Sequence, residues 1–356
     1  TQFMLRYITA AALTAAGLFA GPRSVAAQSA LLNLPRASQH ARITQRIGIT
    51  DVTIDYHRPL LGDRKGLLLA YGQVWRAGAN ENTTIQFSDP VTIEGQTLPK
   101  GVYGLHMIPG ESSWIVIFSK NSTSWGSFTY EKAEDALRVT VKPHAAENQE
   151  ALAYDFDDPA PTSAVITMRW GKVAVPFKVE VNTPEIVEES LRNQLRSRVQ
   201  FEWQAWMDAA SYLLDNKLSA EEALRYASSS IDNEDRFENE IVKSRALTAL
   251  GCNDVARAAR DKAIGLGTQL QIQVFARGLQ RQGRQEEAME LFRINIKKDP
   301  NSWIAHNEAS RIAVAKGDYD TAIKEMKLAR DGSPESLKGQ LADTVRLLEN
   351  KVDINK

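Results

Sequence analysis

Four polar side chains in the first half of the chain are of the kinds that enzymes use for acid–base chemistry. They are His57, Arg76, Glu81 and His106. A histidine beside a carboxylate can accept and release a proton near neutral pH, and an arginine can hold an anionic substrate. If the fold gathers these groups in one pocket, a hydrolase with a histidine base is the expected chemistry. If it scatters them, each one is structural, which is the commoner role of unrelated histidines on strands.

Residues 75–81, Trp-Arg-Ala-Gly-Ala-Asn-Glu, predict a loop that leads into a strand. Gly78 and Asn80 tolerate positive φ, so the backbone can turn sharply there. In one interpretation the loop lines a ligand pocket. The residues of that pocket would be Trp75, Arg76, Asn80 and Glu81. In the other interpretation the tryptophan closes one end of the domain and the arginine forms an ion pair. The candidate carboxylates for that pair are Asp55, Asp63 and Glu81.

Trp125 ends a polar loop, residues 121–126, and offers a further kind of site. The face of an indole ring can stack on a sugar, which makes a glycan one candidate ligand of Trp125. The alternative is that tryptophans of this region, such as Trp114 and Trp125, belong to the core. The residue pattern does not separate these two interpretations.

The composition excludes several other classes of site. The 356 residues include 43 Lys and Arg against 44 Asp and Glu, so no global positive field attracts nucleic acid. Cys252 is the single cysteine, which excludes an intramolecular disulfide and a cysteine-based metal centre within one chain. The chain has no phosphate-binding loop, dinucleotide fingerprint, nucleophile elbow or pair of histidines one helical turn apart. We therefore expect no metal and no cofactor.

The elements that position the first group of residues are strands. Between residues 38 and 181 the chain has about ten short runs rich in β-branched residues, and residues 137–141 alternate apolar and polar side chains. Turn residues separate the runs, for example Gly95, Pro109-Gly110 and a tight link at Gly171-Lys172. This pattern indicates a sandwich or a barrel without choosing between them. We expect an antiparallel β-sandwich over residues 35–181.

Three segments of this region carry a resemblance. They read ITDVTIDYHRPLLGDRKG (residues 49–66), YGQVWRAGANENTTIQFS (residues 71–88) and LPKGVYGLHMIPGESSWIVIFSK (residues 98–120). Together they resemble a bacterial exported family catalogued as domain of unknown function 2911, from about Pro35 to Val181. The resemblance implies an all-β fold and no particular reaction.

The pattern changes to helical at Asn182-Thr183-Pro184-Glu185. Asn182 can cap a helix, with Glu185 three residues on as its capping-box partner, and Pro184 fits the first turn. The sequence predicts one long connecting helix over residues 182–216, followed by helical repeats over residues 217–356.

A constant spacing runs through the last third of the chain. The same interval separates Gly283 from Gly317, Ala288 from Ala322, and Pro300 from Pro334. This order of turn glycine, small alanine and closing proline resembles the tetratricopeptide repeat family, in a degenerate form. The resemblance implies helical hairpins that stack into an interaction surface.

Three arginines recur at a constant place in these hairpins, six residues before the turn glycine. They are Arg245, Arg277 and Arg311, and two amides, Gln273 and Asn307, lie four residues before the latter two. In the repeat family this position faces the concave groove. Stacked guanidinium groups suit a carboxylate or an acidic peptide. The alternative is that the arginines pair with Glu or Asp of neighbouring helices and bind nothing.

Residues 1–27 have the features of a secretory signal peptide. A short start with Arg6 precedes an apolar run over residues 8–20, and Val25-Ala26-Ala27 supplies the small residues that signal peptidase reads. We expect cleavage after Ala27 and a periplasmic or secreted protein. No later apolar run is long enough to span a bilayer, so we expect no transmembrane segment in the mature chain.

These features favour a non-catalytic, exported binding or scaffolding protein. The repeats would hold a protein or peptide partner, and the β-domain a small ligand, a glycan or a second partner. A periplasmic hydrolase with its site at residues 75–81 is the alternative, and a purely structural envelope protein is a third possibility. The reaction or ligand itself does not follow from the sequence.

Overall fold

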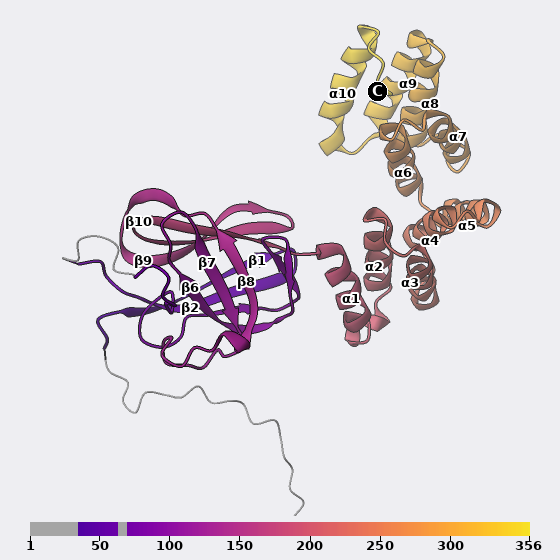
Figure 1. Ribbon diagram of the computed structural model, residues 1–356. Helices are drawn as coiled ribbons and strands as arrows, with labels where there is room; N and C mark the ends of the chain where they lie inside the picture. Colours follow the sequence, from indigo (N-terminus) through magenta and orange to yellow (C-terminus); the bar gives the residue numbers. More distant parts are fainter. Residues whose placement is uncertain (1–34, 63–69) are drawn as a thin grey trace, which may run out of the picture. The chain divides into compact units, whose positions relative to one another are not determined.

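The computed structural model describes residues 35–62 and 70–356 of the chain (Figure 1). The predicted signal peptide and Asp63 lie outside these residues. The chain divides into two compact units, Thr1–Thr183 and Pro184–Lys356. The first is built of strands and the second of helices, and each is described by itself.

The β-unit contains one sheet of six strands and one of four, all paired antiparallel. The larger sheet has the order β1(Gln39–Ile47), β2(Thr50–Arg58), β3(Thr84–Phe87), β6(Gly101–Ile108), β7(Trp114–Ser119), β8(Asp135–Val141). The smaller sheet has the order β5(Gln96–Leu98), β4(Val91–Ile93), β10(Ser163–Glu180), β9(His144–Ala160).

The two sheets pack face to face around an aromatic core, which makes the unit a sandwich. Phe118 of β7 meets Phe177 of β10 with ring centroids 5.8 Å apart, and Tyr56 of β2 meets Tyr154 of β9 at 4.9 Å. Edge-to-face pairs of this kind add to the free energy gained from burying the rings. Alternation along β8 buries Leu137, Val139 and Val141, as the sequence predicted for residues 137–141.

One strand differs from the sequence-based expectation. The tight turn predicted at Gly171-Lys172 is wrong, because β10 runs unbroken through it from Ser163 to Glu180. Gly171 instead takes φ +58 at a point where the pairing of β10 with β9 shifts register. A glycine in the left-handed region is a common way to build a β-bulge, which bends a strand without ending it.

The helical unit begins with two helices in place of the single long helix predicted over residues 182–216. They are α1(Thr183–Gln194) and α2(Trp203–Asp215), with the short 3₁₀ helix η2(Arg198–Phe201) between them. Side chains bind the carbonyls that a continuous helix would use, which explains the break. Ser197 Oγ donates to the carbonyl of Gln194, and the Trp206 indole donates to that of Gln200 at 2.7 Å.

The remaining helices form successive hairpins (Figure 1). They are α2 with α3(Ala220–Asn233), α4(Phe237–Ala249) with α5(Asn253–Leu266), α6(Gln269–Arg281) with α7(Gln285–Ile296), α8(Trp303–Ala315) with α9(Tyr319–Gly332), and a last helix α10(Glu335–Glu349). Gly251, Gly283 and Gly317 each turn a hairpin with φ between +74 and +80. The hairpin repeat predicted from the glycine spacing is therefore confirmed.

Two lysines extend the same rhythm. Lys217 between α2 and α3, and Lys351 after α10, have φ values of +54 and +55. The interval from Lys217 to Gly251 equals the interval from Gly283 to Gly317, and so does the interval from Gly317 to Lys351. The backbone geometry of the turn thus recurs where the glycine signal is missing. No helix of the described residues is both long and apolar enough to cross a membrane.

Candidate functional site

The loop of residues 75–81 brings Glu81 against His57 at the end of β2. The Glu81 Oε2 atom lies 3.4 Å from His57 Nδ1, and Arg36 donates to the other carboxylate oxygen. The ring of His40 lies 5.2 Å from that of His57, and its Nε2 is 2.6 Å from Asp55 Oδ1. Arg36 precedes β1 and belongs to no motif, so sequence reasoning missed it.

Burial and charge favour a neutral imidazole beside an ionised carboxylate in this pair. Burial lowers the pKa of His57 below its ordinary value, more than the Glu81 carboxylate raises it. Burial also opposes ionisation of Glu81, but the Arg36 hydrogen bond and the positive charges nearby leave its pKa lowered. A neutral histidine held by a carboxylate has the protonation state of a general base.

Trp75 and Arg76 pin the loop to the sandwich. Trp75 pairs with Met107 through both backbone hydrogen bonds, and its ring stacks on Trp170 with centroids 5.7 Å apart. Arg76 Nη1 donates to the carbonyl of Asn80 at 2.6 Å, and its guanidinium lies over the ring of Phe128. This agrees with the structural interpretation of Trp75.

The ion pair expected for Arg76 is not formed with Asp55 or Glu81, and Asp63 lies outside the described residues. The positions of positive φ in this loop also differ from the expectation. Ala77 and Asn80, rather than Gly78, take positive φ, at +50 and +59. Gly78 is required for another reason, because a Cβ there would lie 2.5 Å from the Thr83 hydroxyl.

His106 is held in a different environment from His57. It is 2% exposed, its Nδ1 is 2.8 Å from Ser127 Oγ, and its ring packs against Tyr130. Burial lowers the pKa of His106 to about 4. The charge of Asp135 opposes this effect, and the charge of Arg76 adds to it. Among the described residues, no hydrogen bond or ion pair joins His106 to His57 or Glu81. The four candidate catalytic residues therefore do not form a single constellation.

Trp125 and the neighbouring Phe128 expose their rings, at 54% and 78%, whereas Trp114 is buried in the core. Arg36 lies over Trp125, 5.7 Å from its centroid, and Arg76 lies over Phe128 at 5.2 Å. The alternatives left open for the two tryptophans thus separate: Trp114 is structural and Trp125 is on the surface. Sequence reasoning missed Phe128.

Within residues 35–62 and 70–356, no group of three or more His, Cys, Asp or Glu side chains is arranged to hold a metal ion.

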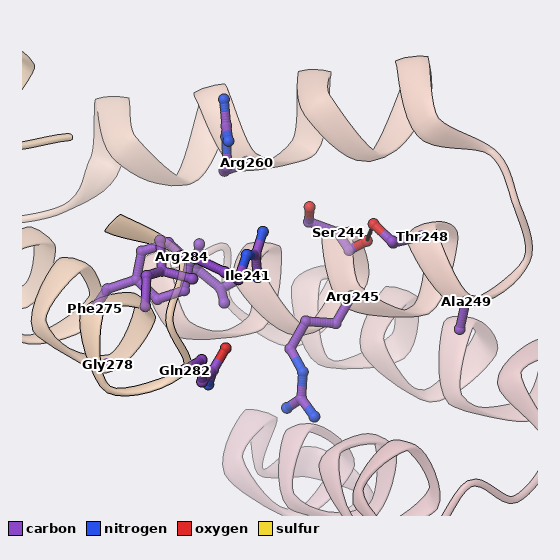
Figure 2. Close-up of a pocket in the computed structure, with 11 residues that line it drawn as sticks. Ile241, Ser244, Arg245, Thr248, Ala249, Arg260, Phe275, Gly278, Gln282 and Arg284 are labelled. Carbon is purple, nitrogen blue, oxygen red and sulfur yellow. Dashed lines mark hydrogen bonds between the residues drawn. The ribbon is translucent and has the colours of Figure 1, made fainter. Parts of the chain in front are cut away.

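Arg245 on α4 takes part in a cavity of about 430 Å³ formed by α4, α5 and α6. Figure 2 shows that the arginines lining this cavity come from different elements. Arg245 lies on α4, Arg260 on α5 and Arg284 in the turn after α6. Apolar lining comes from Ile241, Phe275 and Leu279. A cavity with apolar walls and a few charged groups is the usual form of a ligand site.

The arginines of this cavity have acidic neighbours within the chain. Arg245 pairs with Asp215 of α2, which is the salt-bridged alternative raised by the sequence. Arg284 and Arg260 both approach Glu287, at 2.6 and 3.5 Å. Arg260 also lies 3.8 Å from Asp261, so the three guanidinium groups face three carboxylates, and the Arg245 side chain remains 44% exposed.

Arg277 on α6 and Arg311 on α8 behave differently from Arg245. In the described part of the chain neither lies within ion-pair distance of a carboxylate. Arg277 donates to Gln280, while Arg311 donates through Nε to Asn307 at 3.0 Å and through Nη1 to the carbonyl of Ile354 at 2.6 Å. Burial lowers the pKa of Arg311 to about 9, and the charge of Arg277 lowers it further.

Two buried residues complete this region. Gln273 on α6 is nearly inaccessible, and Glu308 on α8 is fully buried. Burial raises the pKa of Glu308 to about 8, against the opposing effects of the Asn295 hydrogen bond and the charge of Arg311. Sequence reasoning missed Glu308, Gln280 and Gln285, because none of them follows the repeat of the turn glycines.

The fold and these sites define a two-unit protein, a β-sandwich followed by stacked helical hairpins. Residues 38–179 match the family described as "Protein of unknown function (DUF2911)", which confirms the resemblance noted in the sequence. The match covers the β-unit and not the helical unit.

Several solved structures are similar to part of the chain. The APC/C hetero-tetramer Cut9-Hcn1 is 21% identical with a TM-score of 0.29, over 48% of this chain and 33% of that one. MamA is 17% identical with a TM-score of 0.29, over 44% of this chain and 92% of that one. YrrB, a TPR protein with an unusual peptide-binding site, is 17% identical with a TM-score of 0.26, over 46% of this chain and 84% of that one. No curated protein matches the sequence.

Proposed function

We propose that this chain is an exported, non-catalytic binding and scaffolding protein whose helical hairpins hold a protein or peptide partner. The observation that carries the proposal is the cavity between α4, α5 and α6, with Arg245, Arg260 and Arg284 around apolar walls. Its volume suits one or two side chains of a partner. The guanidinium groups favour an acidic side chain, because they bind carboxylates through two hydrogen bonds at once.

The partner's carboxylate would exchange with Asp215 at Arg245. Asp215 is 62% exposed, so its pair with Arg245 is solvated and contributes little to stability. An acidic residue flanked by apolar ones would meet both the charge and the apolar walls of the cavity. This is the class of partner that we expect.

A charge reversal at Arg245 tests the proposal. The probe is a fluorescein-labelled peptide with one Glu between leucines, titrated against the full chain and followed by fluorescence anisotropy. Arg245→Glu should weaken binding at least about tenfold, which corresponds to about 1.4 kcal/mol. The matched control is Arg257→Glu on α5, where the arginine is 66% exposed and lines no part of the cavity. Equal affinities for wild type and both variants, or no binding by wild type, would contradict the proposal.

The β-unit would hold a second ligand at the surface of Trp125 and Phe128. Two exposed rings with guanidinium groups over them are suited to stacking on a sugar and to binding its anionic substituents. A hydrolase is less well supported. It would use the loop of residues 75–81 with His57 or His106 as the base. Glu81 lies 3.4 Å from His57 Nδ1, whereas Arg76 donates to the Asn80 carbonyl and His106 bonds Ser127.

Export remains part of the proposal through the signal-peptide features of residues 1–27. These residues lie outside the described structure, so the support for a periplasmic or secreted location is the sequence pattern alone.

A further inference from the structure

Residues 352–356 fold back onto the helical unit after α10. Lys351 turns the chain with φ +55, and the Val352 amide donates to the carbonyl of Leu347 at 3.0 Å. Two side chains then become nearly inaccessible, Ile354 at 9% and Asn355 at 6% exposed. In Figure 1 the C mark lies beside α8 and α10, in agreement with these contacts.

Residues of three helical segments contact Ile354 and Asn355. Arg311 Nη1 of α8 donates to the Ile354 carbonyl at 2.6 Å, and Gln285 Nε2 of α7 donates to the Asn355 carbonyl at 2.9 Å. Gln280 Nε2 of α6 donates to Asn355 Oδ1 at 3.0 Å, and Asn355 Nδ2 donates to the Arg311 carbonyl at 2.9 Å. Both main-chain carbonyls and both ends of the asparagine amide are thus engaged.

Apolar side chains of the helical unit also contact Ile354. Ile354 packs into a cluster with Ala313 and Val314 of α8 and Leu341 and Val345 of α10. Arg311 has no carboxylate within ion-pair distance among the described residues; it donates to the Ile354 carbonyl at 2.6 Å and to Asn307 Oδ1 at 3.0 Å. The site therefore binds a short segment in the way that a peptide is bound, through its main chain and two adjacent side chains.

We propose that this surface is a peptide site for an aliphatic–asparagine pair, and that Ile354-Asn355 of the same chain occupies it. A partner that carries the same pair binds here by displacing residues 352–356. The inference rests on the partner-binding role proposed for the helical unit, but it uses a different set of residues from the Arg245 cavity. It also changes the earlier interpretation of Arg311, whose groove here binds a neutral amide rather than a carboxylate.

The competition between the two segments sets the expected affinities. A tethered segment acts at an effective concentration on the order of millimolar, so a free peptide binds weakly while the tail stays in place. Asparagine is required at the second position because Asn355 Nδ2 donates to a carbonyl. An aspartate there would lose the donor and place a negative charge against the carbonyl oxygen.

The experiment uses the full chain and a labelled peptide, acetyl-KVDINK-amide, with both ends blocked. Asn355→Ala should bind it at least tenfold more tightly than wild type does, because the tail no longer competes. The aspartate peptide, acetyl-KVDIDK-amide, should bind Asn355→Ala at least tenfold more weakly than the asparagine peptide does. The double variant Asn355→Ala with Gln285→Ala should lose the gain in affinity for the asparagine peptide. The matched control is Asn350→Ala, whose side chain caps α10 by donating to Arg346. It should behave as wild type.

Equal binding of the two peptides by Asn355→Ala, or no gain over wild type, overturns the inference. A second measurement uses unaltered protein and so does not depend on the variant's stability. At several millimolar peptide, roughly above the effective concentration of the tail, hydrogen exchange at residues 352–356 should rise. No rise overturns the inference. Neither measurement involves Arg245, so failure here leaves the acidic-partner proposal standing, and failure of that proposal leaves this one testable.

Discussion

The imidazole of His106 shows how strongly one environment in the sandwich controls ionisation. It lies on β6 beneath the loop of residues 121–130, where Ser127 binds Nδ1 and Tyr130 covers the ring. Because burial lowers its pKa from 6.5 to about 4, folding disfavours the protonated form. Burial also lowers the pKa of His57, but there the nearby Glu81 carboxylate opposes the effect.

We predict that His106 makes the free energy of unfolding depend on pH. Between about pH 6.5 and pH 4 the unfolded chain binds the proton and the folded chain does not, so stability falls as the pH falls. The shift corresponds to a loss of about 3 kcal/mol. His106→Gln should remove this loss, seen as a flatter pH profile of urea unfolding. His144→Gln, at an exposed position on β9, is the control and should keep the wild-type profile. Parallel profiles for His106→Gln and wild type would show that burial does not control this histidine.

The glycines that turn the hairpins are the clearest link between a residue type and an element. At Gly317 φ is +74 and a Cβ would meet no atom within 4 Å, so only the backbone conformation requires glycine there. Gly339, within α10, also has open space around a Cβ, but its conformation is helical.

We predict opposite effects of the same substitution at these two positions. Gly317→Ala should lower the free energy of unfolding by about 1 kcal/mol, because alanine disfavours the left-handed region. Gly339→Ala should raise it by up to about 1 kcal/mol, because alanine favours the helix. Urea unfolding monitored by circular dichroism at 222 nm measures both. A loss of stability in both variants would mean that the turn conformation is not what Gly317 supplies.

Elements were predictable where their signal is local. Strand alternation and the glycine turns recur at fixed spacings, so β8 and the hairpins around Gly283 and Gly317 follow from the sequence. The helix break between α1 and α2 does not, because it depends on Trp206 and Asn233 binding the carbonyl of Gln200. The bulge at Gly171 was not predicted for a different reason: glycine followed by lysine suits both a turn and a bulge.

At the scale of the whole molecule, two units with different element types follow one predicted signal peptide. The compact units meet in sequence at Thr183 and Pro184, close to the change of pattern at residues 182–185. Each unit carries its own candidate site, the exposed rings on the β-unit and the arginine cavity on the helical unit.

We predict that the exported protein begins at Gln28. Intact-mass measurement of protein recovered from the periplasm or the medium should show the loss of residues 1–27. Ala27→Arg should block this cleavage, because signal peptidase requires a small residue at that position. Ala26→Arg, between the two positions that the enzyme reads, is the control and should be cleaved. Recovery of exported wild type with residues 1–27 attached would contradict the signal-peptide assignment.

The sequence by itself determined the kinds of element, the places of the hairpin turns at Gly283 and Gly317 and the resemblance of the β-unit, because each is carried by residue types and spacings along the chain. It also marked Glu81, His57 and the recurrent arginines as candidates. Only the tertiary structure decided what those residues meet. Asn355 contacts Gln280, 75 positions away, and Arg36 contacts Glu81 across 45. Contacts of this range depend on how strands and helices pack, and no spacing in the sequence encodes them.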